Sequence, residues 1–293
     1  MLKPAFSTVA CPEWTLDRVP AAAREFGFGA VELRTFGPAS SDLPCDPALT
    51  EESKTRAAFA RHGIEIVSLA TSCRFDEPIL PPVIGAVISD TERSVREANR
   101  AVDLAIGLGC PVVRVFGFEI PARERRVSGL ARIADRLRLV LDHARASGVK
   151  IAVENGGSFP RALDLLEILD AVRHPLLGAC YSIDQGHAAG ETPADAVREL
   201  GDRLLIARLK DWKAGRPAPL GEGELPCREY VTALAEAGFD GPVVYEWPRM
   251  WVRDIEPAET VLPRAARTLY SWIGGEADAA GAGQQGAARL SGV

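Results

Sequence analysis

Short runs rich in β-branched residues recur along the chain, and a stretch of helix-favouring residues follows each of them. This alternation is typical of a parallel sheet with helices packed outside it. Eight β/α units in roughly 270 residues predict an α/β fold with a single closed (β/α)8 TIM barrel, because an open doubly wound sheet usually has fewer units. The strand candidates cover residues 5–10, 30–34, 65–70, 112–116, 150–154, 177–183, 204–210 and 242–247.

The barrel is expected to occupy residues 1–273 as one domain. The remaining segment, 274–293, contains six glycines and six alanines and almost nothing apolar to bury. Such a composition cannot offset the conformational entropy that is lost on folding. We therefore expect a flexible Gly/Ala-rich tail.

The overall composition bounds the partners that the chain can have. Hydrophobic residues make up 47% of the sequence and charged residues 25%, which is typical of a soluble globular protein. The formal net charge of -6 gives no positive field for a nucleic acid or an anionic membrane. No apolar run approaches the ~20 residues that span a bilayer, and no signal peptide is recognised, so we expect a cytoplasmic protein. No Cys-x-x-Cys pair occurs among the six cysteines, which favours reduced thiols.

Acidic residues lie at the carboxyl ends of three of the strand candidates, where TIM-barrel active sites are built. If Ile151 and Val153 face the helices, alternation turns Glu154 into the lumen at its rim. The same alternation places Asp184 and Glu246 at this rim. Like charges in a partly enclosed mouth repel, so they need a counter-charge or protons. A divalent cation is the usual solution, with Mg or Mn suited to oxygen ligands and Zn or Co suited where imidazole joins.

The seventh strand candidate carries two basic residues, Arg208 and Lys210, at the same level. A guanidinium cannot ligate a metal. Either Arg208 pairs with the carboxylates and replaces the cation, or it lies beside a three-carboxylate metal site and binds an anionic group of a substrate.

Three further arginines lie near the mouth: Arg34 ends the second strand candidate, Arg74 follows the third and Arg114 lies within the fourth. For Arg34 and Arg74, charge balance with acidic neighbours such as Glu32 is the favoured interpretation. Arg114 lies between two valines and is expected to face the lumen. Together with Arg208 it suits a carboxylate or phosphate, which favours an acidic or phosphorylated substrate over a neutral hexose.

Four motifs at the rim and one glycine-rich loop occur in a recognisable order. They are Val153-Glu154-Asn155, Ile183-Asp184-Gln185-Gly186-His187, Leu209-Lys210-Asp211, Leu220-Gly221-Glu222-Gly223-Glu224 and Tyr245-Glu246-Trp247. Together they resemble the xylose isomerase-like TIM-barrel superfamily of sugar isomerases and epimerases. The resemblance covers roughly residues 4–273.

The resemblance implies roles for individual residues. It makes Glu154, Asp184 and Glu246 ligands of a divalent metal (Mn, Mg, Co or Zn), and it places His187 against the substrate. The family's fourth ligand is a histidine two residues before the Lys-Asp pair, but Arg208 stands at that position here. This departure puts the metal itself in question.

The expected reaction is isomerisation or epimerisation of a small polyhydroxy carbonyl compound through an enediolate. Such a reaction moves a proton at the carbon beside a carbonyl, while charge develops on the substrate oxygens. The resemblance gives Glu154 and Glu246 the roles of base and acid. A cation would stabilise the enediolate, and without one Arg208 and Lys210 would do so electrostatically.

Two alternatives stay open. A lyase could dehydrate a cyclic polyol ketone or a dehydroshikimate-like acid, because the same enediolate can expel a β-hydroxyl. A non-catalytic small-molecule-binding barrel would instead use Arg208 in place of the metal. A DNA-repair endonuclease of the same fold is disfavoured, because its sites are rich in histidine and this chain has only four. A homo-oligomer is compatible with the sequence.

Overall fold

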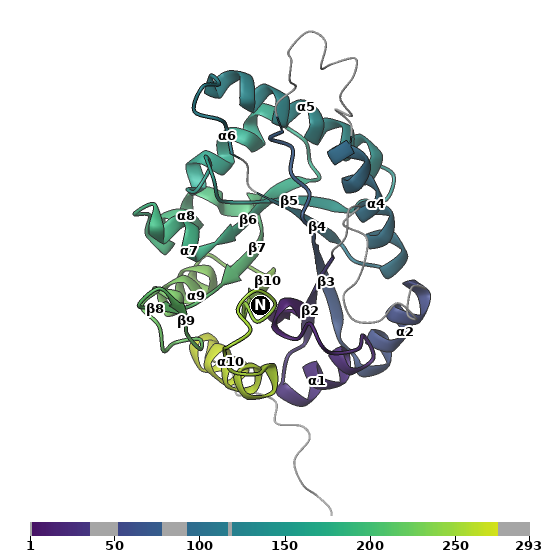
Figure 1. Ribbon diagram of the computed structural model, residues 1–293, viewed down its shortest axis with the longest axis vertical. Helices are drawn as coiled ribbons and strands as arrows, with labels where there is room; N and C mark the ends of the chain where they lie inside the picture. The colour runs from purple at the N-terminus through teal and green to yellow at the C-terminus, as the bar shows by residue number, and fades with distance from the viewer. Residues whose placement is uncertain (1, 36–51, 78–92, 117–118, 275–293) are drawn as a thin grey trace, which may run out of the picture.

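The structure is a computed structural model that describes residues 2–35, 52–77, 93–116 and 119–274. Its parallel strands close into a ring in the order β1-β10-β7-β6-β5-β4-β3-β2, which confirms the predicted TIM barrel. Helices surround this ring on its outside (Figure 1). The barrel strands are β1 (Lys3–Ser7), β2 (Ala30–Arg34), β3 (Glu65–Ala70), β4 (Val112–Val115), β5 (Lys150–Glu154), β6 (Leu177–Ser182), β7 (Leu204–Leu209) and β10 (Pro242–Tyr245). Apart from Gly274, the segment expected to form a tail lies outside the described residues.

The helices follow the strands as the sequence predicts. They are α1 (Arg18–Phe26), α2 (Glu52–His62), α4 (Arg93–Leu108), α5 (Arg126–Ala144), α6 (Ala162–Val172), α7 (Ile183–Ala188), α8 (Pro193–Leu200), α9 (Cys227–Glu236) and α10 (Ala258–Ile273), with 3-10 turns η1 (Thr8–Ala10) and η3 (Gly201–Arg203). A short antiparallel hairpin of β8 (Trp212–Lys213) and β9 (Arg216–Pro217) follows β7. Within the described ranges, no helix combines the length and the apolar character needed to cross a bilayer.

Seven of the predicted strands begin at the predicted residue and end within two residues of the predicted end, and the first strand differs more. Strands β2, β3 and β5 have the predicted bounds, whereas β1 ends at Ser7 and the next three residues form η1. The chain turns here because the backbone N–H of Cys11 donates to the Thr8 carbonyl at 3.1 Å. The Thr8 hydroxyl also accepts a hydrogen bond from the backbone N–H of Arg34 at 2.9 Å, which ties the turn to β2.

Successive side chains along each strand point alternately outward and into the lumen, which produces two separate apolar cores. Outward-facing residues such as Ile151 and Val153 pack against the helices in the larger core. A smaller cluster fills the lumen, and half of its members are alanine or cysteine: Ala5, Ala30, Val67, Val112, Ala152, Cys180, Ile206 and Val244. Because half of these side chains are small, the lumen leaves room for long charged side chains one step further along the strands.

A buried carboxylate fixes the loop that follows the β8–β9 hairpin. Asp211, directly after β7, accepts hydrogen bonds from the backbone N–H groups of Trp212 at 3.0 Å, Gly221 at 2.9 Å, Gly223 at 3.0 Å and Leu225 at 3.3 Å. A Cβ atom at Gly223 would overlap the Asp211 carboxylate, so this position requires glycine. The Leu209-Lys210-Asp211 motif and the glycine-rich loop therefore act as one structural unit beside the mouth.

We predict that Asp211→Asn lowers the free energy of unfolding by about 2–3 kcal/mol. In the wild type both carboxylate oxygens accept hydrogen bonds from backbone N–H groups, whereas the amide of the variant directs an NH2 group toward some of these donors. Urea titration followed by circular dichroism measures the change. The matched control is Asp202→Asn at an exposed position of η3, which is expected to change stability by less than ~0.5 kcal/mol. Equal stability of the two variants would contradict the anchoring role of Asp211.

Candidate functional site

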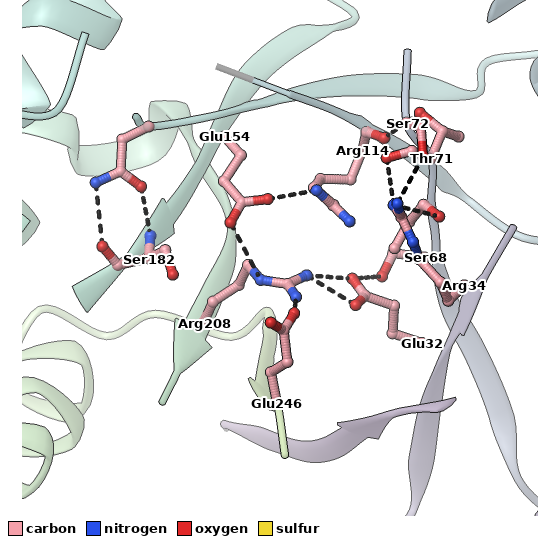
Figure 2. A network of polar contacts seen from close by, with 12 residues as sticks. Glu32, Arg34, Ser68, Thr71, Ser72, Arg114, Glu154, Ser182, Arg208 and Glu246 are labelled. Carbon is pink, nitrogen blue, oxygen red and sulfur yellow. Dashed lines mark hydrogen bonds and ion pairs between the residues drawn. The ribbon is translucent and has the colours of Figure 1, made fainter. Parts of the chain in front are cut away.

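A buried guanidinium lies at the centre of the barrel mouth, among three carboxylates. Strand β7 directs Arg208 into the lumen, because Arg208 shares the alternation of lumen-facing Ile206. Its Nη1 donates to both oxygens of Glu32 on β2 at 2.7 and 2.9 Å, and its Nη2 contacts Glu246 after β10. Its Nε lies 3.5 Å from Oε1 of Glu154 on β5. Figure 2 shows the three carboxylates on three sides of the guanidinium.

A second inward arginine, Arg114 on β4, confirms the predicted orientation. Its Nη1 donates to Glu154 Oε2 at 2.5 Å, and the guanidinium carbon lies 4.4 Å from the ring centre of Phe116. Both oxygens of Glu154 therefore face arginines. Arg114 and Glu154 are almost fully buried, with side-chain exposures of 3% and 5%, so water screens this pair weakly.

Arg74 and Arg34, the other two arginines considered from the sequence, do not pair with Glu154. Arg74 pairs with Asp76 at 2.5 Å, as expected from charge balance. Arg34 donates to the carbonyls of Ala70 and Thr71 and to the Ser72 hydroxyl. Burial lowers the pKa of Arg34 and the charge of Glu32 opposes this shift, as charge balance implies, but the direct ion pair of Glu32 is with Arg208 across the lumen.

The outer part of the mouth is more open and holds Lys210 and Asp184. Lys210 Nζ lies 3.2 Å from Glu246 Oε1 and 3.7 Å from Asp184 Oδ2. Asp184, in the first turn of α7, also accepts hydrogen bonds from Ser182 at 2.6 Å and from Gln185 at 2.9 Å. Lys210 and Asp184 keep 17% and 13% of their side chains exposed, which lets a small molecule reach them. His187 lies exposed on the same helix α7.

The charges of the inner mouth keep one another ionised. Burial would raise the pKa of Glu154, but Arg114, Arg208, Lys210 and Arg34 outweigh burial and lower it to about 2. The pKa of Glu32 is also lowered, because Arg208 and Arg114 outweigh its burial. Burial would lower the pKa of Arg208, but Glu32 and Glu154 raise it instead.

The predicted metal ligands do not form a cation site in this arrangement. Glu154 and Glu246 both face Arg208, and Asp184 lies beside Lys210. Across the described part of the chain, no three His, Cys, Asp or Glu side chains are placed to hold a metal ion. The residues present do not fit the divalent ion that the resemblance implies, because two cationic side chains already lie among its ligands.

Glu32 belongs to this centre but is not among the candidate site residues that the sequence indicates. The signal that could have found it is its alternation along β2, which it shares with lumen-facing Ala30. The same reasoning correctly places Glu154 and Arg114. Ser68 on β3 belongs to the same group, since its hydroxyl donates to Glu32 Oε2 at 2.9 Å.

Comparison with known proteins identifies related sequences over most of the chain. Residues 20–272 match the family described as xylose isomerase-like TIM barrel. The "Putative hydroxypyruvate isomerase" of Streptomyces coelicolor is 30% identical over 252 residues, which are 78% of this chain and 84% of that protein. The ketose 3-epimerase of Arthrobacter globiformis is 27% identical over 235 residues, which are 76% of this chain and 74% of that protein.

Solved structures with low sequence identity share the fold. L-ribulose 3-epimerase has a TM-score of 0.77 at 16% identity, covering 94% of this chain and 95% of its own. The IolI protein with a bound zinc atom has a TM-score of 0.76 at 19% identity, covering 92% and 98%. The probable 3-DHS dehydratase AsbF of Bacillus anthracis has a TM-score of 0.74 at 15% identity, covering 91% and 98%. At these identities the likeness establishes the barrel alone.

We predict that the contribution of Glu154 to stability disappears in acid. The folded-state pKa of about 2 lies below the ordinary glutamate value of about 4.3, so ionised Glu154 stabilises the fold fully above that value. This contribution is lost as the pH falls from about 4.3 to about 2. The difference in unfolding free energy between the wild type and Glu154→Gln, measured by urea titration, should therefore be constant from pH 7 to 5 and shrink below.

The exposed Glu236→Gln variant provides the matched control. A difference between wild type and Glu154→Gln that stays the same down to pH 2 would contradict the ion pairs of Glu154 with the arginines.

Proposed function

This chain belongs to the xylose isomerase-like TIM barrel family, and from that premise we propose that it isomerises or epimerises a small polyhydroxy carbonyl compound at the mouth of the barrel. The names of its curated relatives, a ketose 3-epimerase and a hydroxypyruvate isomerase, support this class of reaction. Both reactions exchange a proton at a carbon beside a carbonyl group.

The observation that carries the proposal is the pairing of Glu154 and Glu246 on either side of one guanidinium. They come from β5 and from the end of β10. Both contact Arg208, and Lys210 lies beside Glu246. A carboxylate beside a substrate carbon can remove a proton from it and return the proton to the substrate.

The two carboxylates differ in how well they can act as the base. Glu154 has a pKa of about 2, which makes it a weak base while both its oxygens face arginines. Glu246 directs one oxygen to Arg208 and the other to Lys210 in the more open part of the mouth. We therefore assign both removal of the proton and its return to the neighbouring carbon to Glu246. Glu154 stays ionised and holds Arg208 and Arg114 in place.

The enediolate that forms needs cationic groups near its oxygens. Among the basic residues of this centre, Lys210 has the most exposed side chain, at 17%. Arg208 and Arg114 are engaged by carboxylates, so they act on the substrate as fixed charges behind the reacting atoms. This distribution supports a substrate with one carboxylate or one pair of oxygens against Lys210 and His187, and it gives less support to a phosphorylated sugar.

We predict that Glu246→Gln lowers turnover by about 10²- to 10⁴-fold, because it removes the proposed base while retaining an oxygen that faces Arg208. The wild type and the variant are incubated in D2O with a panel of ketoses and hydroxypyruvate. Proton NMR then follows deuterium uptake beside the carbonyl and the appearance of the isomer. The exposed Glu236→Gln variant is the matched control and should retain the wild-type rate.

No exchange by the wild-type protein with any compound of the panel would contradict the proposed reaction. Exchange by Glu246→Gln at the wild-type rate would contradict the assigned base. Mass spectrometry of the same samples identifies a dehydration, since the product of a lyase is lighter by one water.

A second candidate is a barrel that binds a small molecule without turnover. It is favoured by one observation, that Arg208 already forms ion pairs with Glu154 and Glu246. Saturable binding of a panel compound in the NMR samples, without deuterium uptake or a new product, would support this candidate over the isomerase.

A further inference from the structure

A carboxylate lies beside each of the three nitrogens of Arg208, although Nε donates no hydrogen bond among the described residues. Nη1 meets both oxygens of Glu32, Nη2 meets Glu246, and Nε lies 3.5 Å from Glu154. The side chain is 1% exposed, and Glu32 is 0% exposed. The positive charge is therefore held in one place by carboxylates from three strands rather than by water.

Glu32 determines where this charge lies. It comes from β2, three strands away from β7 around the ring, so the ion pair spans the lumen. The Ser68 hydroxyl donates to Glu32 Oε2 at 2.9 Å and fixes the carboxylate. If Arg208 turned away, Glu32 would be left as a buried charge without its ion pair, which is strongly unfavourable. Arg208 thus cannot readily give up its position to another cation.

A divalent ion among Glu154, Asp184 and Glu246 would meet two fixed positive charges. Arg208 contacts the first and the last of these carboxylates, and Lys210 Nζ lies 3.2 Å from Glu246 and 3.7 Å from Asp184. Repulsion between like charges is strong in a site that is screened weakly by water. Neither basic side chain can ligate a metal while it carries its proton.

We propose that the Glu32–Arg208 pair is a built-in replacement for the divalent cation of this fold, so that the chain excludes such ions from its mouth and acts without them. The exclusion of metal stands on the geometry alone. The statement that activity needs no metal rests on the proposed function.

The pair also suggests how a metal site could be restored. Histidine at position 208 supplies a neutral nitrogen beside the three carboxylates. Glutamine at position 32 then avoids a buried carboxylate without a partner. The variant Arg208→His with Glu32→Gln therefore removes the internal cation together with its counter-ion. Arg216→His serves as the matched control, because Arg216 is exposed and pairs with Asp254 away from Arg208.

The test is a titration of each purified protein with Mn²⁺ alone, in which electron paramagnetic resonance detects the unbound ion. We expect no binding by the wild type or by Arg216→His up to about 1 mM, and one site in the double variant that is at least about 100-fold tighter. A stoichiometric Mn²⁺ site in the wild type that Glu246→Gln abolishes would overturn the proposal. A folded double variant that binds no more tightly than the wild type would also overturn it.

If the double variant does not fold, the wild type still decides the question. Dialysis against EDTA is expected to leave its deuterium-exchange rate unchanged. Loss of that rate with recovery on adding Mn²⁺ would overturn the metal-free activity. Absence of exchange both before and after dialysis, together with absence of Mn²⁺ binding, would contradict the proposed function and leave the exclusion of metal supported.

Discussion

The structure of the mouth depends on one buried positive charge. Arg208 carries a guanidinium that water does not reach, and it is stable there because Glu32, Glu154 and Glu246 surround it. Removing any one member would leave an unbalanced charge in a poorly screened environment. The ionisation of Glu154 and the placement of Lys210 follow from the same centre.

The barrel makes this centre possible through the size of its lumen residues. Ala30, Ala152 and Cys180 fill little of the space inside the strands. The long side chains of the next step along β2, β5 and β7 can therefore reach one another across the ring. A lumen filled with larger residues at these positions would separate the charges. Packing inside the barrel thus decides which charges meet at the mouth.

Much of this arrangement follows from the sequence because strand alternation is a simple rule. The period of two residues turns Glu154, Arg114 and Arg208 inward, and the structure agrees. What the rule cannot give is the partner that each charge selects across the lumen. That choice depends on side-chain reach between strands distant in sequence, which is why Glu32 is expected beside Arg34 and is found with Arg208.

The first strand shows the other limit of sequence patterns. Residues 8–10 are apolar or β-branched enough to continue a strand, but hydrogen bonds to the Thr8 backbone and hydroxyl turn the chain after Ser7. The bond between Arg34 and the Thr8 hydroxyl joins distant parts of the chain and leaves no local signal in the sequence. The family resemblance also fails to predict the charge of the site. Arg208 stands where the resemblance implies a histidine ligand, and this one difference changes the charge of the whole centre.

The central claim is that a guanidinium takes the place of a divalent ion, and a crystal structure of the wild-type protein grown with Mn²⁺ tests it most directly. Anomalous scattering at the manganese edge reveals a bound ion independently of activity. The account predicts continuous density for the Arg208 guanidinium between the three carboxylates and no anomalous peak beside them. A strong anomalous peak among Glu154, Asp184 and Glu246, with Arg208 turned out of the lumen, would contradict it.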